Sequence, residues 1–171
     1  MGVVSLFPFD AKAPALLFDQ VKGLPRLHPD VQTMLDWLVE VCAAEKLSRP
    51  FVTCFGRSRD DQEAIYLPNY LQALAADGVG DDAASRELAR QRARNRFSWH
   101  CIPRSAEGEL GFCRAMDLRY WVWSDKARAH LIEEARKKWP KAELLDHAVP
   151  GGSRHLHFGL PDPNGKPADW L

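Results

Sequence analysis

The chain has 171 residues, the usual length of one globular domain, and 46% of them are hydrophobic, which is enough for a core without disulfides. Its 23 basic and 23 acidic residues cancel to a net charge of zero, which excludes a strong overall attraction to nucleic acid or to an anionic membrane. The sequence shows neither a signal peptide nor a stretch of transmembrane length. We therefore expect a single domain over residues 1–171, made in the cytoplasm as a monomer, with no nucleic-acid partner and no membrane insertion.

The N-terminal part predicts an irregular arm, a helix and a buried strand. Residues 1–28 contain several Pro and Gly and show no sustained period. From Asp30 to about Lys46 apolar residues recur at helical spacing, so a helix is expected there. Residues 51–55 are β-prone and lie between a proline and a glycine, as expected of a buried strand.

Two further helices are expected in the middle of the chain. Asp60 is suited to cap a helix over about 60–76, and Pro68 is expected to break it. Residues 81–96 are rich in Ala, Arg and Glu, which predicts a solvent-facing helix. Its arginines could contact nucleic acid, but the zero net charge favours a solvated face or a wall for an acidic substrate.

The second half of the chain alternates strands with one helix. We expect a strand over 112–123, a helix over 124–139, strands over 142–146 and 154–160, and a Pro/Gly-rich tail over 161–171. The four cysteines (Cys42, Cys54, Cys101 and Cys113) are scattered as in a reduced protein, although Cys101 and Cys113 could pair under oxidising conditions.

Two histidines near the C-terminus indicate a metal site. His155 and His157 are separated by one residue, so on a strand both imidazoles point to the same face. Such a pair also occurs on solvated strands. His100 and Asp117 add a third imidazole and a carboxylate, and two His with one carboxylate are the ligand set of many catalytic zinc ions. The alternative is that Asp117 pairs with a neighbouring arginine, Arg114 or Arg119, and that His100 is a hydrogen-bonded core residue.

Three sequence blocks resemble one enzyme family. They are Phe55-Gly56-Arg57-Ser58-Arg59-Asp60-Asp61-Gln62, then Ser98-x-His100 with Ala115-x-Asp117, then Glu143-Leu144-Leu145 followed by His155-Leu156-His157-Phe158. Together they are similar to the zinc peptidoglycan peptidases that include D-alanyl-D-alanine carboxypeptidases and L-alanyl-D-glutamate endopeptidases, related in fold to lysostaphin-type enzymes and the hedgehog domain. The resemblance implies an α+β fold with a small, mostly antiparallel sheet whose strands carry the zinc site and are flanked by helices.

The resemblance also implies roles for individual residues. Zinc would be bound by His100, Asp117 and His157. Some family members use a glutamate three residues before the last ligand as the base; that position is Arg154 here, so the base role passes to His155, with Glu143 or Asp146 as substitutes. These two carboxylates are also candidates to support the ligand imidazoles.

Three residues are expected to contact substrate: Arg57, Ser98 and Gln62. Arg57 would stabilise an oxyanion or bind a substrate carboxylate, unless it is a surface arginine paired with Asp60 or Asp61. Sixteen residues separate His100 from Asp117, more than in the family, so the segment 102–111 is expected to be an inserted surface loop beside the cleft.

These observations predict hydrolysis of a peptide bond in peptidoglycan stem or cross-link peptides. The expected biological role is that of a phage-type or prophage-type endolysin that acts on the cell wall after release through a separate pore. The alternative is a non-catalytic, hedgehog-like domain in which the zinc is structural and the cleft binds a partner.

Overall fold

The computed structural model describes residues 27–107, 109, 111–147 and 154–170. The predicted N-terminal arm lies outside this part of the chain except for its last two residues. The described elements form the expected α+β fold, with four α-helices and one four-stranded sheet. Among the described residues, no helix has the length and apolarity that a membrane crossing requires.

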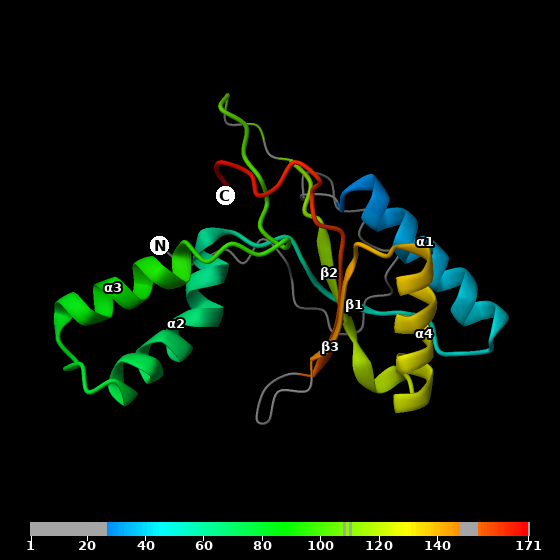
Figure 1. The fold of residues 1–171 in the computed structure, drawn as a ribbon, viewed down its shortest axis with the longest axis horizontal. Coiled ribbons are helices and arrows are strands. Elements are labelled where there is room, and N and C mark those ends of the chain that lie inside the picture. The colour runs from blue at the N-terminus through cyan, green and yellow to red at the C-terminus, as the bar shows by residue number, and fades with distance from the viewer. Residues whose placement is uncertain (1–26, 108, 110, 148–153, 171) are drawn as a thin grey trace.

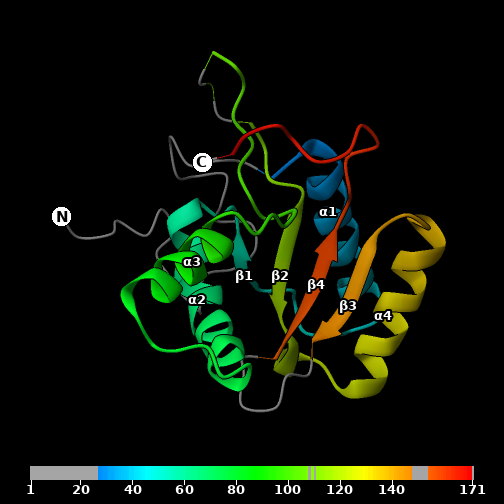
Figure 2. The same cartoon turned by 60° about the vertical axis from the view of Figure 1, so that its left-hand side comes forward.

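The sheet is antiparallel and has the strand order β1-β2-β4-β3 (Figure 2). Its strands are β1 (Val52–Phe55), β2 (Ala115–Arg119), β3 (Glu143–His147) and β4 (His155–Gly159). Asp117 of β2 lies opposite His157 of β4, and Arg119 lies opposite His155. Across the other side of β4, His147 of β3 lies opposite His155. The register therefore brings chemically active side chains from three strands to one region of the sheet.

One face of the sheet forms the hydrophobic core. The helices α1 (Pro29–Ala44) and α4 (Asp125–Lys138) lie on this side (Figure 1). Alternate residues of β2, β3 and β4 point into it, and five of these side chains are buried: Met116, Leu118, Leu144, Leu156 and Phe158. Because side chains alternate along a strand, the residues between them must point to the opposite face, where polar groups collect.

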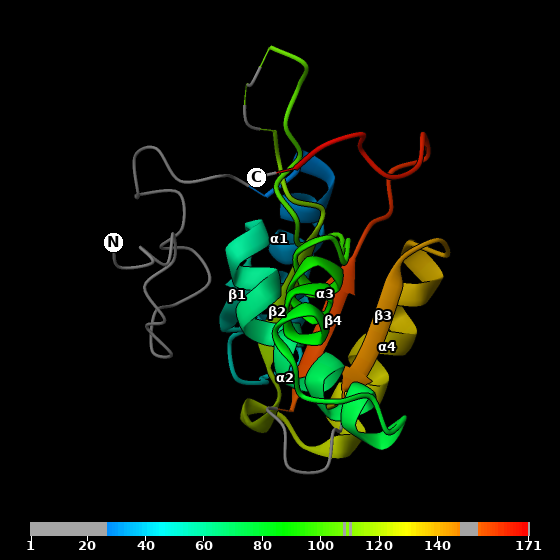
Figure 3. The ribbon, with the colours of Figure 1, turned by 90° about the vertical axis from the view of Figure 1, so that its left-hand side faces the viewer.

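The helices α2 (Arg59–Ala76) and α3 (Ala83–Arg94) form a pair on the other side of the sheet (Figures 1 and 3). Helix α3 is mostly exposed, as expected, with only Ala89 and Ala93 buried. Three of its arginines pair with acidic groups: Arg86 with Asp81, Arg90 with Glu63 and Glu87, and Arg94 with Asp60 and Glu63. These ion pairs support a solvated face for α3.

Three details differ from the sequence-based expectations. Helix α2 is capped by Ser58 and not by Asp60, since the Ser58 side chain forms a capping box with Asp61, and the helix continues through Pro68 without ending there. The strand expected over 112–123 is shorter, since residues Tyr120–Val122 turn into a 3-10 helix. His100 was expected on a strand but lies in a turn between α3 and β2. The sheet strands therefore carry two of the three predicted ligands.

Candidate metal centre

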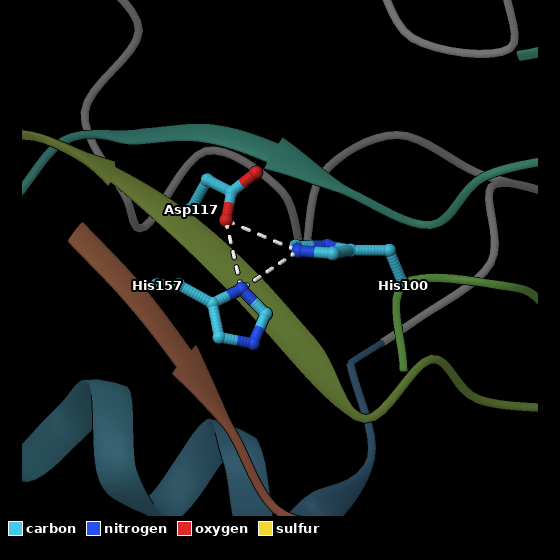
Figure 4. A group of neighbouring side chains, drawn as sticks. All are labelled: His100, Asp117 and His157. Carbon is cyan, nitrogen blue, oxygen red and sulfur yellow. Dashed lines mark hydrogen bonds and ion pairs between the residues drawn. The ribbon is translucent and has the colours of Figure 1, made fainter. Parts of the chain in front are cut away.

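Three side chains converge at the polar face of the sheet (Figure 4). Nε2 of His100 lies 3.1 Å from Oδ1 of Asp117 and 3.1 Å from Nδ1 of His157. Nδ1 of His157 lies 3.0 Å from the same carboxylate oxygen. All three residues are buried, with exposed fractions of 2%, 3% and 8% for His100, Asp117 and His157. Two imidazole nitrogens and one carboxylate oxygen could hold a metal ion here.

The turn that carries His100 is fixed by backbone contacts with the end of β1. The amide of Arg57 donates to the carbonyl of His100 at 2.6 Å, and the amide of Ile102 donates to the carbonyl of Arg57 at 3.1 Å. The turn is closed by the amide of Cys101, which donates to the carbonyl of Ser98 at 2.8 Å. Residues far apart in sequence thus place His100 against the two strand ligands.

Gln62 of α2 also contacts the segment that leads into this turn. Its side chain is completely buried, and its amide nitrogen donates to the carbonyl of Arg96 and lies 3.4 Å from the hydroxyl of Ser98. Gln62 and Ser98 thus make contacts within the segment that leads to His100. Their predicted contacts with substrate stay predictions.

Arg57 pairs with the metal-site carboxylate and not with Asp60 or Asp61. Its Nη2 donates to Oδ2 of Asp117 at 2.9 Å, while Oδ1 faces the two imidazoles. Burial alone raises the pKa of Asp117, but the adjacent His100, His157 and Arg57 outweigh it and hold this pKa well below its usual range. Asp117 therefore stays ionised, as a candidate metal ligand must, and is held in place by a permanent cation.

Burial has the opposite consequence for His100. Loss of hydration is the largest effect and lowers its pKa to about 4, even though Asp117 favours the charged form. A neutral imidazole keeps a lone pair on a ring nitrogen, and this is the form that binds metal ions.

His157 is supported by Glu143. Its second ring nitrogen, Nε2, lies 3.6 Å from Oε2 of Glu143, whose other oxygen accepts a hydrogen bond from the indole of Trp99 at 3.2 Å. A carboxylate behind a ligand imidazole fixes the tautomer that leaves the other nitrogen for the metal. Glu143 was named from sequence as such a support. Asp146, the other candidate, bonds to Arg128 of α4 at 3.1 Å, so it lies on the opposite face of the sheet.

The hydrogen-bonding needs of these groups test whether a cation fits. Without a cation, both imidazoles would donate to Oδ1 of Asp117, and Nε2 of His157 would then present a lone pair to the Glu143 carboxylate. With a cation, the lone pairs of both ligand histidines turn inward and Nε2 of His157 carries a proton towards Glu143. The contact with Glu143 therefore fits a bound metal better than a hydrogen-bonded triad, whereas Nδ1 of His100, which would carry the proton in the metal-bound form, has no hydrogen-bond partner among the described residues.

Two more histidines lie beside the three ligands. Nε2 of His155 is 3.6 Å from Oδ1 of Asp117, and its side chain is 26% exposed. The ring of His147 stacks at a tilt on that of His155, with centroids 4.8 Å apart. Burial, followed by the neighbouring His155 and His157, lowers the pKa of His147. Sequence analysis missed His147 because it ended β3 one residue too early; a strand through residue 147 places it on the face of Glu143.

A cavity of about 280 Å³ has Trp99 as one of its lining residues. Phe97, Phe112 and Pro103 contribute to its walls, and the buried Cys101 also lines it. Pro103 belongs to the segment 102–111, whose described residues 104–107 and 109 are exposed while Ile102 is buried in the core. The segment is thus a surface loop anchored at its start. Cys101 and Cys113 are not joined by a disulfide.

Comparisons with known proteins give no relative for this chain: no protein-family model, no curated protein and no solved structure matches it.

Proposed function

We propose that the protein is a zinc-dependent peptidase that hydrolyses a peptide bond in the stem or cross-link peptides of bacterial peptidoglycan. The observation that carries this proposal is the convergence of His100, Asp117 and His157 beside a fourth, partly exposed histidine. Three N or O ligands with a further position for water or substrate are typical of catalytic zinc sites, whereas structural sites usually have four protein ligands.

The spacing of the ligand atoms supports zinc. Ligands at about 2.0–2.1 Å from a tetrahedral ion are roughly 3.3 Å apart. The separations in this protein are 3.0 to 3.1 Å, so a small widening of the triad accommodates the ion. When bound, zinc supplies a lowered pKa for water and polarisation of the scissile carbonyl.

The protein groups around the ligands supply the remaining chemistry. His155 accepts the proton of the attacking water on Nε2, the nitrogen that faces Asp117, and returns it to the leaving amine. Arg57 keeps Asp117 ionised and oriented, and its guanidinium is a candidate to bind the substrate oxygen as well. The Glu143 carboxylate, 3.6 Å from Nε2 of His157, favours the tautomer with its proton on Nε2 and thereby keeps Nδ1 available for the metal.

The choice of peptidoglycan as the proposed substrate rests on the three sequence blocks, which resemble those of the zinc peptidoglycan peptidases. Each block contributes to one place in the structure: Arg57 and Gln62 from the first, His100 and Asp117 from the second, and Glu143, His155 and His157 from the third. The corresponding biological role is that of a phage-type endolysin that reaches the wall after release.

The test is incubation of the zinc-loaded protein with purified peptidoglycan, followed by mass spectrometry of the soluble fragments. The proposal expects fragments with a new amino and a new carboxyl terminus at one type of peptide bond, and their loss when zinc is removed. Stoichiometric zinc without any fragment would instead favour the non-catalytic, hedgehog-like alternative.

A further inference from the structure

Arg119 has an unusual environment for an arginine on the polar face of the sheet. Its Nε and Nη2 atoms are shielded from solvent and have no hydrogen-bond partner among the described residues. Buried polar groups are nearly always paired, and a charged group loses more than a neutral one when it is not. Unpaired donors on a permanent cation therefore call for an acceptor from outside the chain.

The two unpaired atoms define the kind of acceptor. Nε and Nη2 lie on the same edge of the guanidinium and donate in parallel, which matches the two oxygens of a carboxylate. The same edge of Arg86 binds Asp81 in this way, with Nε and Nη2 each 2.6 Å from one carboxylate oxygen. On Arg119 the equivalent edge has no hydrogen-bond partner among the described residues.

Aromatic rings hold the guanidinium in place. Its carbon Cζ lies 4.6 Å from the ring centre of Trp121 and 5.6 Å from that of Phe51. Stacking on aromatic faces uses the flat sides of the guanidinium and leaves its donor edge for a ligand. Trp121 is 62% exposed, the largest exposure among the large hydrophobic side chains in the described part of the chain, so this ring reaches the surface while the donor atoms of Arg119 beneath it are shielded.

The position of Arg119 links this edge to the metal centre. It lies two residues after Asp117 on β2 and directly opposite His155 on β4. Residues two apart on a strand share a face and are about 7 Å apart, roughly the length of two residues of an extended peptide. A carboxylate bound at Arg119 would thus belong to a residue close to the bond that is cut.

We propose that Arg119 is a substrate-binding residue that binds a peptide carboxylate within about two residues of the scissile bond. This inference rests on the proposed peptidase function for its substrate class, because peptidoglycan stem peptides carry both terminal and side-chain carboxylates. Because Arg57 is paired with Asp117, Arg119 is the better placed of the two arginines for the substrate carboxylate, and Arg57 keeps the expected role at the substrate oxygen.

The experiment compares two small ligands that differ only in the carboxylate: acetyl-D-alanine and acetyl-D-alaninamide. Their dissociation constants are measured by NMR titration of the zinc-loaded protein, of Arg119→Met and of Arg119→Lys. Zinc itself favours the carboxylate in all three proteins, so the informative quantity is the change in preference. A bidentate charged pair corresponds to about a tenfold to hundredfold preference, and Arg119→Met should lose most of it. Arg119→Lys should recover only part, because an ammonium lacks the planar edge.

Arg154→Met is the matched control. Arg154 is exposed, stacks on Tyr120 with Cζ 4.8 Å from the ring centre, and precedes His155 in the chain, so this variant removes the same charge near the site. It should keep the wild-type preference. An unchanged preference in Arg119→Met, or an equal weakening of both ligands, would overturn the proposal. A retained preference for acetyl-D-alanine together with intact peptidoglycan would contradict the peptidase function and leave the carboxylate site standing.

Discussion

His155 and His157 project from the same face of β4 but have different surroundings. Nδ1 of His157 lies within 3.1 Å of both other ligand atoms, whereas His155 approaches Asp117 only to 3.6 Å and is partly exposed. We predict that His157→Ala loses zinc and activity together, with zinc affinity reduced at least tenfold. His155→Ala should keep near-wild-type zinc and lose on the order of a hundredfold in turnover. Elemental analysis and peptidoglycan hydrolysis measure the two effects.

A surface histidine provides the control for this pair. His130 of α4 is bonded to Glu45 far from the site, and His130→Ala should change neither zinc content nor turnover. Zinc loss in both β4 variants would make His155 a ligand. Normal turnover in His155→Ala would assign the base role to Glu143, because Asp146 is engaged by Arg128 on the opposite face.

Gly159 makes room for the ligand imidazole. A Cβ atom at this position would lie 3.0 Å from Nε2 of His157 and 3.3 Å from Cβ of Ala115. We predict that Gly159→Ala displaces the imidazole or its contact with Glu143 and lowers zinc affinity by roughly tenfold, as do other changes behind metal ligands. A competition titration with a zinc-binding dye measures this. Gly80→Ala, where the nearest atom is 3.9 Å away, should leave zinc affinity unchanged; equal affinities for the two variants would contradict the steric argument.

At the scale of elements, apolar spacing, composition and capping residues located the four α-helices and four strands to within a few residues, because these are local properties of the sequence, whereas the 3-10 helix Tyr120–Val122 was missed. The strand pair of His155 and His157 was predictable for the same reason. The turn of His100 was not, since it depends on the backbone of Arg57 and the side chain of Gln62, contacts between distant segments. The partner of Arg57 depends likewise on a contact between distant segments, and His147 was missed because the end of β3 was placed one residue too early.

The helix α2 should influence metal binding through Gln62. This side chain is buried and its amide donates to the carbonyl of Arg96, at the start of the segment that leads to His100. Gln62→Met keeps the volume but leaves that carbonyl without its partner, which costs about 1–3 kcal/mol of folding stability. We also expect weaker zinc binding, since the His100 turn loses a support. Thermal unfolding and a zinc titration test both effects.

Gln72→Met is the matched control for this variant, because residue 72 is an exposed position on the same helix. It should change neither quantity. If Gln62→Met lowered stability while zinc affinity stayed at the wild-type value, Gln62 would be a core residue without influence on the site.

At the scale of the whole molecule, one face of the sheet forms the stabilising core and the opposite face carries the candidate metal site. The core between the sheet and the helices α1 and α4 is apolar and does not involve the ligands. The opposite face joins β2, β4 and the turn before β2 through His100, Asp117 and His157. A protein of this design should remain folded without its metal, while the metal adds to its stability.

Chelation tests this division. An ion that binds only the folded chain stabilises it by about 4 kcal/mol when present at a thousand times its dissociation constant. For a domain of this size, each kcal/mol corresponds to about 2–4 °C in Tm. Removal of zinc with a chelator should therefore lower Tm by roughly 10 °C, with unchanged circular dichroism at 25 °C. Asp117→Ala lacks one ligand, so its Tm should not respond to the chelator. Complete unfolding of the wild-type protein by chelation would show that the metal is required for the fold, and an unchanged Tm would show that the triad binds no zinc.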